Sequence, residues 1–101
     1  MTSIKGKWSL VTGASRGVGS HVSEGLARLG SNIILHAREA GHAQPLADKL
    51  AGLGVKVAVV AGELSDQKQV DALLDDALRQ AAQIDIVYNN AAIMTARPAR
   101  R

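Results

Sequence analysis

Hydrophobic positions follow two alternating periods along the chain. Predominantly apolar runs, typical of strands buried on both faces, occupy residues 8–11, 33–36, 55–61 and 84–88. Between these runs, apolar residues recur every three or four positions, as in helices that cover a sheet. The resulting order, βαβαβαβ, predicts an α/β fold with a parallel sheet and helices on both of its faces.

Capping and turn residues delimit the three predicted helices. Gly30 is placed to end the first helix. Pro45 lies near the expected start of the second helix and Gly54 follows its expected end. Ser65 is the predicted N-cap of the third helix, with Asp66 in its first turn. The predicted buried stripes are Val18, Val22, Leu26 and Leu29; Leu46, Leu50 and Leu53; and Val70, Leu73, Leu74, Ala77, Leu78 and Ala81.

Right-handed crossovers between parallel strands restrict the topology. We expect a doubly wound sheet with strand order 3-2-1-4, truncated after its fourth strand, and with the chain reversing direction across the sheet between strands 1 and 4. In such sheets ligands bind beyond the carboxyl ends of the strands at this switch point.

Three glycines lie where the first strand would turn into the first helix. Gly13 permits a tight exit from the strand, Gly17 lets the backbone approach a phosphate, and Gly19 lets the helix press against the sheet. Free N–H groups at the helix start form an anion site, for which a pyrophosphate is the natural ligand. The spacing G-x-x-x-G-x-G differs from both the G-x-G-x-x-G fingerprint and the Walker loop.

Two motifs together resemble those of the short-chain dehydrogenases/reductases. They are Thr12-Gly13-x-x-x-Gly17-x-Gly19 and, at the end of the fourth strand, Asn89-Asn90-Ala91-Ala92. The resemblance extends through about Met94 and implies a Rossmann fold that transfers hydride between NAD(P) and a carbonyl or alcohol. It implies that the glycine turn holds the pyrophosphate and that the Asn-Asn-Ala segment borders the adenosine ribose and the nicotinamide. Ala92 replaces the family's usual glycine.

The resemblance also implies the remaining cofactor contacts. Glu63, followed by Leu64, stands near the position where the family places an aspartate beside the adenine. We therefore expect residues 1–94 to form a partial NAD(P)-binding domain and residues 95–101 to form a basic, disordered tail. The predicted cofactor-binding residues are Thr12, Gly13, Ser15, Arg16, Gly17, Val18, Gly19, Arg38, Glu63, Leu64, Asn90, Ala91 and Ala92.

Charge at the end of the second strand favours NADP(H) over NAD(H). NAD-selective sites place a carboxylate there to bind the ribose hydroxyls. This chain instead has Arg38, which can grip a 2′-phosphate, while Arg16 can close on its other side. The alternative is that both arginines are solvated surface residues, in which case NAD(H) also binds.

The chain does not contain the family's catalytic set. The family uses a serine and a tyrosine followed four residues later by a lysine, whereas the only tyrosine here, Tyr88, is followed by Ala92 and is expected to pack in the core. We predict no catalytic residue and no metal ligand. His21, His36 and His42 are scattered along the chain and are interpreted as surface or packing residues.

Two functional hypotheses follow. The chain is the cofactor-binding portion of an NADP-dependent oxidoreductase, inactive alone and needing the missing half before it acts on a carbonyl or alcohol substrate. Alternatively, it is a non-catalytic nucleotide-binding or interaction module that functions at this length. Thr12 and the Asn89-Asn90 pair argue against a third reading, a methyltransferase with a similar fold.

The amino-acid composition limits the classes of binding partner that we expect. Twelve basic residues against nine acidic ones leave a net charge of +3, which Arg97, Arg100 and Arg101 supply, so a nucleic-acid partner is not expected. The chain lacks cysteine, a signal-like start and a membrane-length apolar run, and we expect a cytoplasmic protein without a membrane partner. The edge of the fourth strand predicts self-association or pairing with a complementing fragment.

Overall fold

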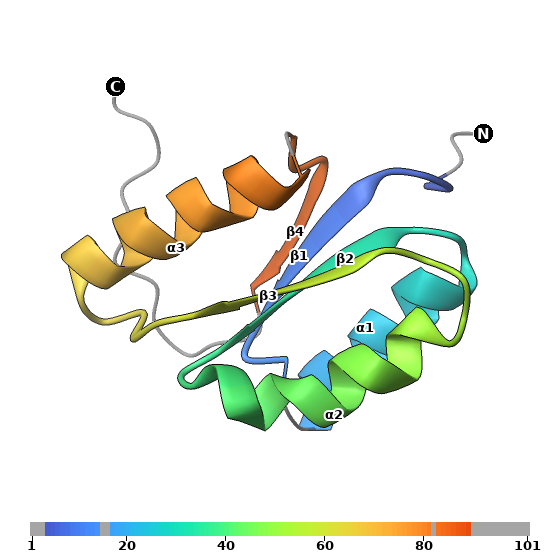
Figure 1. Ribbon diagram of the computed structural model, residues 1–101, viewed down its shortest axis with the longest axis horizontal. Coiled ribbons are helices and arrows are strands. Elements are labelled where there is room, and N and C mark those ends of the chain that lie inside the picture. Colours follow the sequence, from blue (N-terminus) through green and yellow to red (C-terminus); the bar gives the residue numbers. More distant parts are fainter. Residues whose placement is uncertain (1–3, 15–16, 82, 90–101) are drawn as a thin grey trace.

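The computed structural model describes residues 4–14, 17–81 and 83–89. Its four strands form one parallel sheet in the order β3-β2-β1-β4, which confirms the predicted topology (Figure 1). The elements are β1 (Trp8–Thr12), α1 (Gly17–Arg28), β2 (Asn32–Ala37), α2 (Ala40–Ala51), β3 (Val57–Ala61), α3 (Gln67–Ala81) and β4 (Ile86–Asn89).

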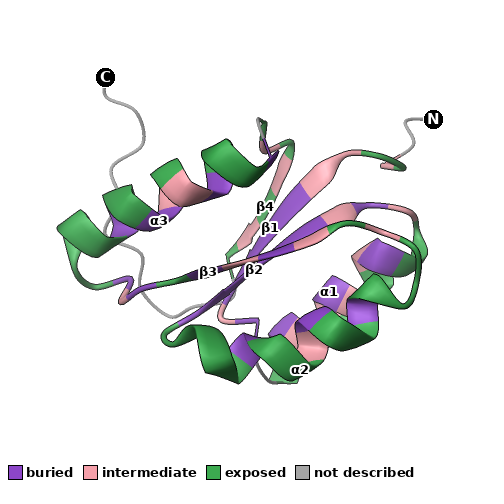
Figure 2. Cartoon of the chain, in the orientation of Figure 1, coloured by how far each residue is buried: buried purple, intermediate pink, exposed green. Residues whose placement is uncertain are grey.

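Helices cover both faces of the sheet, with α1 and α2 on one face and α3 on the other (Figure 1). Alternate residues of the central strands supply two separate cores. Leu10 and Ile34 face α3, whereas Val11, Ile33 and Leu35 face α1 and α2. The buried sides of the helices are turned toward the sheet (Figure 2). Burial on both faces explains why these central strands are predominantly apolar.

The buried face of α1 differs from the predicted stripe. Val18 and Leu29 are 58% and 66% exposed, so their assignment to the buried face is wrong. Small side chains let the helix backbone lie close to the sheet, and they carry too little hydrophobicity to reveal that face in the sequence. The fully buried residues of this helix are Gly19, Ser23 and Ala27.

The start of α2 also differs from the prediction. The helix begins at Ala40, so Pro45 lies inside it and not near its start. Proline has no N–H, and the carbonyl of Gly41, four residues earlier, therefore receives no helical hydrogen bond from it. The helix ends at Ala51, and Leu53 lies beyond it, 37% exposed.

The N-cap of α3 is Asp66 and not Ser65. The Asp66 carboxylate accepts a hydrogen bond from the backbone N–H of Lys68 at 3.0 Å and another from the Gln69 side chain at 3.1 Å. Asp66 therefore precedes the first turn of the helix instead of lying within it. Most of the predicted stripe is buried, but Leu78 is 46% exposed.

Strand β4 is less buried than its apolar sequence predicts. Its residues alternate between half-buried and exposed, and Val87 is 56% exposed. Tyr88 is half-buried and packs against the core under α1 and α2, as expected. The beginning of β4 is tied to β1 by Asp85, whose carboxylate accepts the Trp8 N–H at 3.0 Å and whose own N–H donates to the Trp8 carbonyl at 2.9 Å.

Candidate functional site: the carboxyl edge of the sheet

The carboxyl ends of all four strands meet along one edge of the sheet. Thr12 is in register with Asn89, and Ala37 is in register with Ala61. The loops that follow β1, β2 and β3 therefore gather at this edge, beside the switch point between β1 and β4. Within the described residues, these loops contain four of the predicted cofactor-binding residues, Gly13, Arg38, Glu63 and Leu64, and the first turn of α1 contains Gly17, Val18 and Gly19.

The described glycines of the glycine turn have backbone conformations that other residues rarely adopt. Gly13 and Gly17 have φ values of 61° and 63°, in the left-handed region that favours glycine. A Cβ built on Gly17 would meet no atom of the other described residues within 4 Å, so none of them fills the space beside this backbone. Gly17 begins α1, whose first N–H groups have no acceptor within the helix, and Val18 beside it is exposed. An anionic group is therefore electrostatically favoured here.

Thr12 links the two strands at the switch point. Its hydroxyl donates a hydrogen bond of 2.9 Å to the side-chain oxygen of Asn89. Because 77 positions separate the two residues in the chain, this contact joins the start of the glycine turn to the beginning of the Asn-Asn-Ala segment.

The imidazole of His36 contacts the backbone of two of these loops. The imidazole is 2% exposed; its Nδ1 accepts the Gly13 N–H at 3.0 Å, and its Nε2 lies 2.9 Å from the Gly62 carbonyl. The flanking backbone makes parallel contacts, from the Ala14 N–H to the His36 carbonyl and from the Gly62 N–H to the Ala37 carbonyl. The sequence predicts a surface or packing role for His36 and does not indicate the contact to Gly13.

Arg38 and Glu63, predicted separately, form an ion pair. The Arg38 Nε lies 3.1 Å from the Glu63 carboxylate, and the two side chains are 76% and 40% exposed. The pair bridges the loops after β2 and β3, and both groups remain accessible to a ligand. Leu64, in contrast, is buried in the core beneath α3.

Five predicted site residues lie outside the described part of the chain. They are Ser15, Arg16, Asn90, Ala91 and Ala92.

The two clear pKa shifts occur away from this edge. Hydrogen bonding to Arg28, and then to Lys49, lowers the pKa of Glu24 on α1, and hydrogen bonding to the Trp8 N–H lowers the pKa of Asp85. Within residues 4–14, 17–81 and 83–89, no three His, Asp or Glu side chains are grouped to hold a metal ion. No helix in these same ranges is long and apolar enough to cross a membrane.

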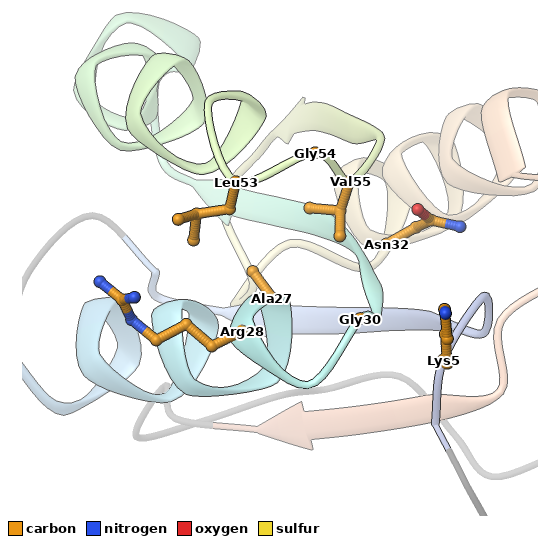
Figure 3. A pocket seen from close by; sticks show the side chains of 8 residues that line it. All are labelled: Lys5, Ala27, Arg28, Gly30, Asn32, Leu53, Gly54 and Val55. Atoms are coloured by element: carbon orange, nitrogen blue, oxygen red, sulfur yellow. The ribbon is translucent and has the colours of Figure 1, made fainter.

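A pocket of about 390 Å³ lies at the opposite end of the sheet (Figure 3). It is formed where α1 and α2 end and β2 begins, and Lys5 and Arg28 are its charged lining residues. This pocket is separate from the glycine turn, and no predicted site residue lines it.

Known proteins match both the sequence and this arrangement. A family model described as short chain dehydrogenase matches residues 7–101. The chain belongs to the short-chain dehydrogenase family. A 3-oxoacyl-acyl-carrier-protein reductase of Pseudomonas aeruginosa is 40% identical over 91 residues, covering 90% of this chain and 37% of that protein.

Solved structures of this family show the same architecture. The L-sorbose reductase of Gluconobacter frateurii, complexed with NADPH and L-sorbose, superposes with a TM-score of 0.85 at 34% identity, covering 90% of this chain and 35% of that one. A metagenomic short-chain oxidoreductase in complex with NADP gives 0.83 at 28% identity, covering 91% of this chain and 42% of that one. The chain spans 35–37% of the length of several curated relatives and 7% of a much longer one.

Proposed function

We propose that this chain is the NADP(H)-binding portion of a short-chain oxidoreductase that transfers hydride between NADP(H) and a carbonyl or alcohol substrate. The observation that carries the proposal is the glycine turn beside the switch point of a 3-2-1-4 sheet. Gly13 and Gly17 both have left-handed backbone conformations there, and Gly17 begins α1. Family membership and relatives solved with NADP and NADPH support it.

The residues of this edge fit a dinucleotide. The open space beside Gly17 and the N–H groups of the first turn of α1 would receive the pyrophosphate. Arg38 and Glu63 would border the adenosine, on the loops after β2 and β3. Thr12 and Asn89 would hold the ends of β1 and β4 together on the nicotinamide side. The bound cofactor supplies the hydride.

Preference for NADP(H) is the finer part of the proposal. Arg38 is 76% exposed, so its guanidinium can turn toward a 2′-phosphate and form charge-assisted hydrogen bonds. No carboxylate stands at the end of β2, where an NAD-selective site would need one, because β2 ends in His36-Ala37 before Arg38.

Reduction itself would need groups outside these 101 residues. A carbonyl receiving hydride also needs a proton donor, and Tyr88 lies in β4 with its ring half-buried against the core. We propose that these residues bind the cofactor and that other parts of the enzyme bind the substrate and supply the proton.

A binding titration with two matched variants tests the proposal. Gly17→Ala places a Cβ on a left-handed residue, whereas Gly25→Ala adds one in the middle of α1, where no neighbour lies within 4 Å. We expect Gly17→Ala to weaken NADPH binding by about tenfold or more, because backbone strain of about 1–3 kcal/mol would distort the cradle. Gly25→Ala should bind like the wild type.

Calorimetry or NADPH fluorescence would measure both affinities, with circular dichroism confirming that each variant folds. Absence of NADPH and NADH binding by the folded wild-type chain would refute the proposal. Equal affinities of the two glycine variants would show that the turn is not the binding site.

A further inference from the structure

The buried, polar side chain of His36 contacts two of the loops at the carboxyl edge of the sheet. The ring is 2% exposed and contacts backbone groups on both sides, at 3.0 Å to Gly13 and 2.9 Å to Gly62. Gly13 begins the glycine turn, and Gly62 immediately precedes Glu63. The imidazole therefore helps to fix the cradle relative to the Arg38–Glu63 pair, together with the backbone hydrogen bonds from Ala14 to His36 and from Gly62 to Ala37.

The two contacts permit one protonation state. The Gly13 N–H can only donate, so Nδ1 must carry a lone pair; the Gly62 carbonyl can only accept, so Nε2 must carry the hydrogen. The ring is thus neutral, in the Nε2–H tautomer. A second proton would place an N–H at Nδ1 against the N–H of Gly13, and a buried donor without its acceptor is costly.

We propose that His36 is a positioning residue for dinucleotide binding, and that its protonation releases the Gly13 end of the cradle and weakens binding. The inference rests on the proposed function for the identity of the ligand. The ring touches no ligand atom in this scheme, because it acts through the backbone of Gly13 and Gly62.

Among the described residues, the charged groups of the elements packed around the ring are engaged with other partners. The flanking strands β1 and β3 contain no ionisable side chain, and α3 turns the apolar Val70 and Leu73 toward this face. At the carboxyl edge, Arg38 pairs with Glu63, and Asp66 caps α3. Among these groups, His36 is therefore the one whose protonation would break a contact to the glycine turn.

Nuclear magnetic resonance tests the geometry without any ligand. In the ¹⁵N-labelled full chain at neutral pH, we expect Nε2 of His36 to be protonated, Nδ1 to be unprotonated, and the Gly13 amide to show a shift characteristic of a hydrogen bond. A protonated Nδ1 at neutral pH would overturn the inference.

Binding of NAD⁺ tests the consequence, because NAD⁺ lacks a 2′-phosphate that would itself titrate. As the pH is lowered through the range in which the ¹⁵N resonances show a proton binding to Nδ1 of His36, wild-type affinity should fall about 5- to 50-fold. His36→Asn retains an acceptor near the Nδ1 position and cannot be protonated, so its affinity should stay nearly constant with pH. His36→Leu, which removes both contacts, should bind weakly throughout.

His21→Asn, at an exposed position of α1, is the matched control and should retain the wild-type profile. A wild-type affinity that stays constant while Nδ1 of His36 gains a proton, or a His36→Asn variant that loses affinity as steeply as the wild type over the same pH range, would overturn the inference. Failure of every variant and the wild type to bind any dinucleotide would refute the proposed function instead, while the resonance measurement would still decide the ring geometry.

Discussion

The ion pair between Arg38 and Glu63 leads to a prediction about cofactor selectivity. A 2′-phosphate that binds Arg38 must compete with the Glu63 carboxylate, which lies 3.1 Å from the guanidinium. Glu63→Gln removes this competitor and its repulsion of the phosphate while keeping a similar shape. We therefore expect the substitution to strengthen NADPH binding and to leave NADH binding nearly unchanged, because NADH has no 2′-phosphate.

The size of the effect follows from the geometry. Two unit charges 3.1 Å apart in bulk water attract by about 1.3 kcal/mol. Because the side chains are 76% and 40% exposed, the measured range for surface pairs, about 0.2–1 kcal/mol, is the better guide. NADPH should therefore bind about 1.4- to 5-fold more tightly, and the gain should shrink at high salt.

Parallel titrations of NADPH and NADH measure the effect. Glu39→Gln is the matched control, since it removes one negative charge from the same edge at a side chain that is 77% exposed and does not pair with Arg38. Equal weakening of both dinucleotides by Glu63→Gln would refute the reasoning, because it would mean that Glu63 contacts the part of the cofactor they share.

Three further substitutions test the packing that supports the site. Pro45→Ala should raise the free energy of unfolding by about 1–3 kcal/mol in urea denaturation, because an N–H would then reach the Gly41 carbonyl; a loss of stability would contradict this account of α2. Glu24→Gln should lower the melting temperature at neutral pH, because the Glu24 carboxylate binds both Arg28 and Lys49. The pKa of Glu24 is lowered in the folded protein, so its contribution to stability is present above the pKa of the unfolded state and is lost as the pH falls through the pKa of the folded state. The difference in melting temperature between wild type and variant should therefore be larger at about pH 7 than at about pH 3. Ala27→Leu should destabilise by about 1–3 kcal/mol in the same urea assay, since its Cβ faces the sheet with 2% exposure, and an unchanged midpoint would show that α1 does not lie close to the sheet.

Hydrophobic periodicity predicted the order of strands and helices, and the right-handed crossover rule then predicted the topology of the sheet. The apolar runs of β1 and β2 are buried on both faces, and burial on both faces leaves a strong signal. Periodicity did not reveal the buried face of α1, because small side chains form it. Local preference also misplaced Pro45: the buried packing of Ala43, Ala47 and Leu50 on α2 outweighs the preference of proline for the start of a helix. Local signals are weakest where tertiary contacts decide the outcome.

The candidate site was predicted as separate residues and not as contacts. Arg38 and Glu63 were each assigned to the cofactor edge, but their pairing depends on the register of β2 and β3, which no local pattern contains. His36 was missed because its role lies in two backbone contacts from distant loops. Its place among apolar residues near the end of a strand was the only available signal.

The pairing of β1 with β4 has a consequence for how the molecule folds. Its hydrogen-bonded partners Thr12 and Asn89 are separated by 77 positions, whereas β1 and β2 are joined by a single helical crossover. Closing the longer loop costs more chain entropy, so we expect the β1–α1–β2–α2–β3 segment to assemble first and β4 to dock last. The nicotinamide side of the crevice would then be completed only in the final step of folding, and pulsed hydrogen exchange should show the amides of β4 gaining protection after those of β2.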